Sequence, residues 1–228
     1  MPAPPVIWKS EVTPGTETIL PDGCLDIIWT GDGLVIAGPD TVPNAFTSDI
    51  SRSMVGARFA PGVGAGVIGH DAAALRNRRV AASDLWAPAQ VRRWTEQLAA
   101  ADDPAHTLSA LIAGRAVEPA PGWMAPVLAR VLDGDRVAHI ADEVGVSVRT
   151  VHRIFLRHCG YGPKMLARIL RMRAAMTLVC AGGAAADLSA IAHRVGYADH
   201  AHMCREFGEL AGAPPSEFRP AQRSGSTQ

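Results

Sequence analysis

Three glycines between residues 64 and 69 have the spacing of a nucleotide-binding loop. The segment from Gly64 to Gly69 has the sequence GAGVIG, and a G-x-G-x-x-G loop holds the pyrophosphate of a dinucleotide when it joins a strand to a helix. A dinucleotide fold also needs strands and helices that continue to alternate after the loop, and no such alternation follows Asp71. The segment is therefore interpreted as a glycine-rich turn in a β-rich domain, with a cofactor-binding enzyme as an alternative.

Arginine recurs at every fourth position in one segment of the second half of the chain. Arg149, Arg153 and Arg157 share one face of a helix, His152 lies beside Arg153, and apolar residues occupy the opposite face. Guanidinium groups bind guanine edges and phosphates, so a helix of this kind suits the major groove of DNA. We predict DNA contacts from these four residues.

The cysteines do not form a recognisable framework. Cys24, Cys159, Cys180 and Cys204 are widely separated without a C-x-x-C pair, which predicts neither disulfides nor structural zinc and fits a reducing cytoplasm. Cys204 lies four residues after His200, but no convincing third ligand accompanies them, so we predict no metal site. Cys24 lies in an Asp-Gly-Cys turn. Three interpretations of it are open: a packing residue, a redox or electrophile sensor, or the nucleophile of a DNA-repair alkyl transferase.

The pattern that positions these residues changes along the chain. Before about residue 70, short apolar or alternating runs separated by turn formers indicate strands. From Asp71 to Val117 the pattern is helical, with Ser83 or Asp84 as the cap of a helix that continues through Gln97. The segment EPAPG at 118–122 is typical of a linker, and the sequence after it is helical.

The C-terminal half contains a duplicated motif. The segment IADEVGVS that starts at residue 140 recurs as IAHRVGYAD, 51 residues later. In each copy a glycine, Gly145 or Gly196, stands where a first helix must end. Ser147 or Asp199 then provides a side-chain oxygen to cap a second helix. These are the requirements of a helix-turn-helix, so we predict two of them.

The second copy carries a weaker cationic face than the first. Its second helix contains His200, His202 and Arg205, but Glu206 and Glu209 add negative charge that phosphates repel. We expect this copy to bind DNA less strongly.

A long helix is predicted between the two copies, ending at Gly182-Gly183. One of its faces is apolar and consists of Met165, Ile169, Met172 and Met176. Another face carries cations that are expected to contact phosphate, namely Lys164, Arg168 and Arg171. Such a helix would hold the two DNA-binding helices apart, as two adjacent major-groove segments about 34 Å apart require.

Residues 123–219 resemble the DNA-binding domain of the AraC/XylS family of bacterial transcription regulators. The resemblance is carried by IADEVGVSVRTVHRIFLRHCGYGP, by IAHRVGYADHAHMCREFGELAGAPPSEFR and by the G-x-x-P-S-x-x-R ending at 212–219. It implies seven helices, of which the third and sixth enter successive major grooves. It assigns base contacts to Arg149, His152, Arg153, His200, Ala201 and Arg205. The chain departs from the family pattern at Ala201, Met203 and Gly208, which weakens the expected readout by the second copy.

The first half resembles the N-terminal sensory domain of a subset of actinobacterial members of this family, through PDGCLDIIW, ARFAPG and VAASDLW. This resemblance implies a β-rich, cupin-like effector domain followed by helices. Residues 1–119 contain only two histidines, so we expect a metal-free pocket. The candidate pocket residues are Trp8, Cys24, Trp29 and Trp86, and the tryptophans either line the pocket or fill the core.

The sequence thus predicts an α+β protein with two domains. Residues 1–118 form the β-rich sensory or dimerisation domain, 119–122 the linker, 123–220 the all-α domain with two helix-turn-helix motifs, and 221–228 a disordered tail. Residues 1–119 carry 9 Lys and Arg against 13 Asp and Glu, whereas residues 120–228 carry 13 against 9. This asymmetry indicates that the second half meets a polyanion.

The predicted function is that of a cytoplasmic, nucleoid-associated transcription regulator. Its expected partners are double-stranded promoter DNA, RNA polymerase, a small organic effector and a second copy of the chain. No catalysis and no cofactor are expected. No membrane contact is expected either, since no apolar run approaches the roughly 20 residues that cross a bilayer.

Overall fold

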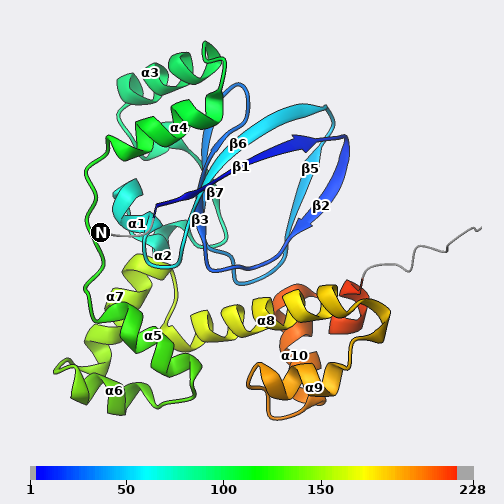
Figure 1. Ribbon diagram of the computed structural model, residues 1–228. Helices are drawn as coiled ribbons and strands as arrows, with labels where there is room; N and C mark the ends of the chain where they lie inside the picture. The colour runs from blue at the N-terminus through cyan, green and yellow to red at the C-terminus, as the bar shows by residue number, and fades with distance from the viewer. Residues whose placement is uncertain (1–3, 220–228) are drawn as a thin grey trace, which may run out of the picture.

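The computed structural model describes residues 4–219, apart from the Ala184 side chain. The tail predicted at 221–228 lies outside these residues. The N-terminal part is rich in strands: β1 (Val6–Val12), β2 (Gly15–Ile19), β3 (Leu25–Trp29), β4 (Leu34–Ala37), β5 (Asn44–Ser48), β6 (Arg52–Phe59) and β7 (Arg79–Ala81). Five of them form an antiparallel sheet in the order β1-β6-β3-β4-β7, and β2 pairs with β5 in a second, two-stranded sheet (Figure 1).

Helices cover the five-stranded sheet and enclose the first core. They are α1 (Gly64–Ile68), α2 (Ala72–Leu75), the 3-10 helix η1 (Ala82–Asp84), α3 (Pro88–Ala99) and α4 (Pro104–Ala113). Ile27, Ile36 and Phe59 of the sheet are fully buried in one cluster with Leu98 of α3 and Leu108 of α4. This packing removes apolar surface from water and holds the two trailing helices against the strands.

Two details of the helical prediction for residues 71–117 are wrong. The segment contains β7, which pairs with β4, because tertiary pairing completes the sheet there. The long helix begins at Pro88 and not at Ser83 or Asp84, which lie in η1 without a side-chain cap. Proline suits the first helical position and keeps the preceding residue out of the helix.

The C-terminal part is all-α, as predicted. It contains α5 (Met124–Leu132), α6 (Val137–Glu143), α7 (Val148–Cys159), α8 (Pro163–Gly182), η2 (Gly183–Ala185), α9 (Leu188–Arg194), α10 (His200–Ala211) and η3 (Pro215–Phe218). Helix α8 runs from the group formed by α5, α6 and α7 to the group formed by α9 and α10 (Figure 1). Its predicted apolar face is confirmed, since Ile169 and Met172 are fully buried and Met165 and Met176 pack against the same core. No helix within residues 4–219 combines the length and apolar character needed to cross a bilayer.

The glycine segment forms the short helix α1 and not the predicted turn. A Cβ atom on Gly64 would lie 2.7 Å from Cβ of Leu25, and one on Gly66 would lie 1.9 Å from the backbone oxygen of Glu118. The amide of Glu118 also donates to the Gly66 carbonyl at 3.2 Å. The glycines therefore permit close packing against the sheet and against the segment that leads to α5. This packing leaves no open loop at Gly64 or Gly66 for a pyrophosphate.

Replacing Gly66 by alanine is expected to destabilise the protein. The new methyl group would force α1 and residue 118 apart, and overpacking of this kind costs about 1–3 kcal/mol. Urea unfolding followed by circular dichroism measures the loss. Gly122→Ala is the matched control, because a Cβ atom there meets nothing within 4 Å. Equal midpoints for the two variants would contradict the close approach.

Candidate nucleic-acid interface

Both predicted helix-turn-helix motifs are present, with the predicted turn and cap residues. In the first, Gly145 has a φ of 69° between α6 and α7, and Ser147 Oγ accepts an amide hydrogen from the first turn of α7 at 3.1 Å. In the second, Gly196 has a φ of 86° and Asp199 Oδ1 accepts an amide hydrogen from the first turn of α10 at 2.6 Å. A glycine with positive φ ends the first helix, and the side-chain oxygen caps the start of the second. Local sequence therefore defines the turn between the two helices of each motif.

Helix α7 presents three of its predicted contact residues together. Val151 and Phe155 are fully buried, whereas Arg149, His152 and Arg153 lie on the exposed side of the helix. Within residues 4–219 these three side chains form neither a hydrogen bond nor an ion pair. Their polar groups are therefore available to a partner outside the chain, and they form a cationic face one helical turn long.

Arg157 does not belong to this face, contrary to the sequence prediction. Its Nη2 donates to Glu118 Oε2 at 2.8 Å, and its Nε lies 3.4 Å from Asp71 Oδ1. Helices α1 and α2 pack against this end of α7, and Arg76 Nη1 donates to the Gly160 carbonyl at 3.4 Å. The charge of Arg157 is thus directed to carboxylates of the N-terminal part, and we withdraw it from the predicted DNA contacts.

Helix α10 presents a smaller cationic face. His200, Ala201 and Arg205 are exposed. His202 is half-buried: its ring packs edge-on against Tyr197 with 5.2 Å between centroids, and its Nε2 lies 3.6 Å from Glu206 Oε1. The second motif therefore offers Arg205 as its one arginine on α10, and weaker binding by this motif stays a prediction.

The cations of α8 mainly hold helices together. Arg168 Nε donates to Glu206 Oε1 at 3.0 Å, and its Nη2 pairs with Glu209. Arg171 lies over the ring of Tyr197 at 5.3 Å and 4.0 Å from Glu206 Oε1. Arg168 is therefore an unsuitable phosphate ligand, and we withdraw that prediction. Glu206, expected to repel phosphate, is buried and paired instead.

Lys164 remains a predicted phosphate contact. It is exposed in the first turn of α8, and the residues that the structure describes offer its ammonium group no ion-pair partner. A flexible, solvated ammonium group of this kind can contact phosphate as a point charge.

Comparison with known proteins agrees with this geometry. Residues 140–221 match a family described as a helix-turn-helix domain, and residues 6–81 match a domain of unknown function. The chain carries a helix-turn-helix domain of the AraC type. Helix α7 is the third α-helix of this AraC-type domain and α10 the sixth, the positions that the resemblance assigns to DNA-binding helices.

Three solved structures show what the chain is similar to. A probable AraC family transcriptional regulator from Rhodopseudomonas palustris is 25% identical over 42% of this chain and 94% of that one, with a TM-score of 0.36. ToxT from Vibrio cholerae is 10% identical over 95% of this chain and 98% of that one, with a TM-score of 0.50. ToxT with a bound unsaturated fatty acid is 13% identical over 96% of both chains, also with a TM-score of 0.50. The ToxT likeness concerns the fold alone, and no curated protein matches the chain.

Among the residues that the structure describes, the four residues predicted for an effector pocket line neither the cavities beside α3 and α4 nor those beside α1 and the predicted linker. Trp8 Nε1 donates to Asp26 Oδ1 at 2.9 Å, Trp29 is buried in the sheet core, and Trp86 Nε1 donates to the Ile68 carbonyl at 2.9 Å. These tryptophans have satisfied structural roles. Two cavities beside the trailing helices, of about 500 and 560 Å³, are lined by other residues.

Cys24 has the environment of a packing residue. Its amide donates to Asp22 Oδ1 at 2.9 Å, and burial, with the nearby Asp22 carboxylate, raises the pKa of the Cys24 thiol to about 12. A thiol with so high a pKa contains almost no thiolate at neutral pH, and the thiolate is the nucleophile. This argues against both the sensor and the alkyl-transferase interpretation.

The sequence did not indicate the two acidic residues that pair with Arg157. Asp71 lies 86 residues before Arg157, and Glu118 lies 39 residues before it. Neither is at a helical spacing from that arginine, so no periodicity could reveal the pairs. The weak signal was the position of Glu118 at the start of the predicted linker.

Arg168→Ala is expected to act on stability before it acts on DNA binding. The change leaves the Glu206 carboxylate buried without its main partner, which we expect to cost about 2 kcal/mol, less than for a fully buried pair because the Arg168 side chain is 29% exposed. Thermal and urea unfolding of the full chain measure this. Arg173→Ala on the same helix is the control, since Arg173 is exposed. A loss of DNA affinity with unchanged stability would restore Arg168 as a phosphate ligand.

Proposed function

We propose that this protein is a sequence-specific DNA-binding transcription regulator whose N-terminal domain senses a small molecule. The observation that carries the proposal is that Arg149, His152 and Arg153, on the third helix of an AraC-type domain, are exposed and have no partner within residues 4–219. Side chains of these types bind base edges and phosphates when such a helix enters a major groove. Binding then releases counterions, so affinity falls steeply as salt rises.

The proposed division of the chain follows the elements. The sensory domain takes residues 1–118, the linker 119–122 and the DNA-binding domain 123–220, in keeping with the interval between the end of α4 at Ala113 and the start of α5 at Met124. A ToxT structure that shares the fold holds an unsaturated fatty acid, which supports a small organic effector for this chain. The effector acts, in this proposal, through the contact of the N-terminal domain with α7.

The remaining parts of the proposal follow from promoter binding. The regulator acts in the cytoplasm at the nucleoid, with RNA polymerase and a second copy of the chain as partners, and it performs no catalysis. Two local findings support the absence of catalysis in this proposal. Gly64 and Gly66 are used for packing, and the Cys24 thiol is largely buried.

Arg153→Ala tests specific recognition. A guanidinium group that binds a base edge contributes about 1–3 kcal/mol of discrimination, so affinity for the selected site should fall roughly tenfold or more while affinity for random DNA changes little. The site is first selected from random-sequence duplexes with the full chain, and fluorescence anisotropy then measures both affinities. Arg92→Ala on α3 is the control, because α3 lies far from α6 to α10 (Figure 1). Equal losses on both duplexes would assign Arg153 to the phosphate backbone.

Glu118→Gln tests whether the N-terminal domain restrains α7. Removing this partner of Arg157 should strengthen DNA binding by the full chain about two- to fivefold, because a partly exposed ion pair contributes up to about 1 kcal/mol. Asp142→Asn removes the same charge from α6, and Asp142 is exposed without an ion-pair partner among residues 4–219. If Asp142→Asn gives the same gain, net charge explains the effect and the restraint is refuted.

A further inference from the structure

A cavity of about 500 Å³ opens between α3 and α4, at the point where α4 leads into the linker. Its lining consists of Gln90, Arg93, Trp94, Gln97, Ala110, Leu111, Gly114, Arg115 and Ala116. Two of these residues are cationic and none is acidic. The volume lies within the range of about 300–1,000 Å³ that is usual for small-molecule sites.

Arg115 at the inner wall has an unused donor. Its Nε donates to the Val67 carbonyl at 2.8 Å and its Nη2 to the Ile68 carbonyl at 3.3 Å, and its guanidinium lies 4.2 Å from the centre of the Trp86 ring. Nη1 is buried and has no hydrogen-bond partner within residues 4–219. No carboxylate within residues 4–219 forms an ion pair with Arg115. Arg115 as a whole is half-buried, and a partly desolvated cation without an anion is costly, so an anionic ligand would stabilise it.

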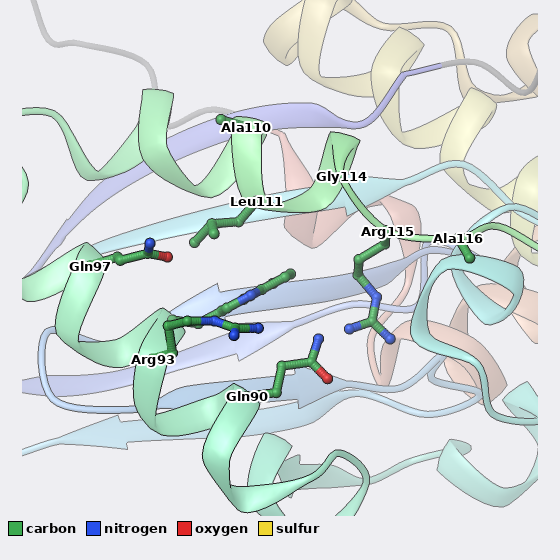
Figure 2. A pocket seen from close by; sticks show the side chains of 9 residues that line it. Gln90, Arg93, Gln97, Ala110, Leu111, Gly114, Arg115 and Ala116 are labelled. Atoms are coloured by element: carbon green, nitrogen blue, oxygen red, sulfur yellow. The ribbon is translucent and has the colours of Figure 1, made fainter.

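The other cavity residues add a second cation and an apolar surface. Figure 2 shows Arg93 and Gln90 of α3 directed into the same space as Arg115, with Leu111 of α4 above them. Arg93 is exposed and forms no ion pair with a described residue. Trp94, buried beneath this space, and Leu111 supply apolar contacts. Two guanidinium groups beside an aromatic ring suit a carboxylate with an apolar body.

We propose that this cavity binds a small organic carboxylate, with the carboxylate between Arg93 and Arg115 and the apolar body against Trp94 and Leu111. The proposal deepens the proposed function and rests on it, since it gives the sensory domain a site and a ligand class.

The cavity is also connected to α7 through short contacts. Arg115 binds the last two carbonyls of α1, and the Gly66 carbonyl of the same helix accepts the amide of Glu118. The Glu118 carboxylate in turn pairs with Arg157. A ligand that draws the Arg115 guanidinium toward the cavity therefore acts on the helix that holds the partner of Arg157.

The test measures binding of octanoate and 2-naphthoate to the full chain by isothermal titration calorimetry, without DNA. The neutral amides of the same two acids serve as matched ligands. At least one carboxylate should bind saturably and about tenfold or more tightly than its amide, because charge-assisted hydrogen bonds are roughly twice as strong as neutral ones. Arg93→Gln should weaken that binding about fivefold or more, whereas Arg92→Gln, one residue away and outside the cavity lining, should leave it within about twofold.

Arg115→Gln should abolish binding, and circular dichroism checks its fold because Arg115 also holds α1. If that variant unfolds, the binding measured for Arg93→Gln and for the neutral amides still tests the proposal. The proposal is overturned if neither acid binds saturably in the millimolar range, if acid and amide bind alike, or if Arg92→Gln weakens binding as much as Arg93→Gln. DNA affinity of the ligand-free chain is measured separately, so failure here is distinguishable from failure of the proposed function.

Discussion

The pairing of Arg157 with Asp71 and Glu118 joins the two parts of the molecule at α7, the second helix of the first helix-turn-helix motif. Arg157 lies one turn beyond Arg153 on α7, so the same helix that presents exposed cations to solvent is bound at its other end to the N-terminal part. Partly exposed ion pairs are individually weak. Separating α7 from these two carboxylates would therefore require only a modest free energy.

The two helix-turn-helix motifs have the same local geometry but different electrostatic surroundings. On α7 the arginines nearest the turn have no ion-pair partner in the described part of the chain. Behind α10, in contrast, the buried Glu206 lies close to Arg168, Arg171 and His202 from two helices. That network fixes α10 on α8 and draws cationic groups inward. The first motif consequently presents more exposed cationic groups to solvent than the second.

Features set by neighbours in the sequence could be predicted, and features set by distant residues could not. The turn glycines, the capping oxygens of Ser147 and Asp199 and the apolar face of α8 depend on spacings within one or two helical turns, and all were found as expected. The α+β class also followed from local pattern. The strand β7 escaped prediction because its pairing partner lies more than 40 residues away.

Side-chain partners were harder to predict than elements. Arg157 and Arg168 share the helical spacing of the other predicted contact residues, yet their charges are bound by Glu118 and Glu206, each about 40 residues distant. The cavity between α3 and α4 likewise gathers residues whose association depends on the packing of two helices. Sequence spacing tells which residues share a face, but long-range packing decides what that face meets.

The contact of Gly66 with the Glu118 backbone makes the connection between the two parts stiff from its first residue. A Gly/Ser tether samples many separations and lets attached modules search independently. Here the peptide of residue 118 rests on α1 with no intervening side chain, so only the few residues before α5 are free of that helix. The freedom of the two parts to rotate relative to each other is thereby restricted to the short stretch between residue 118 and α5.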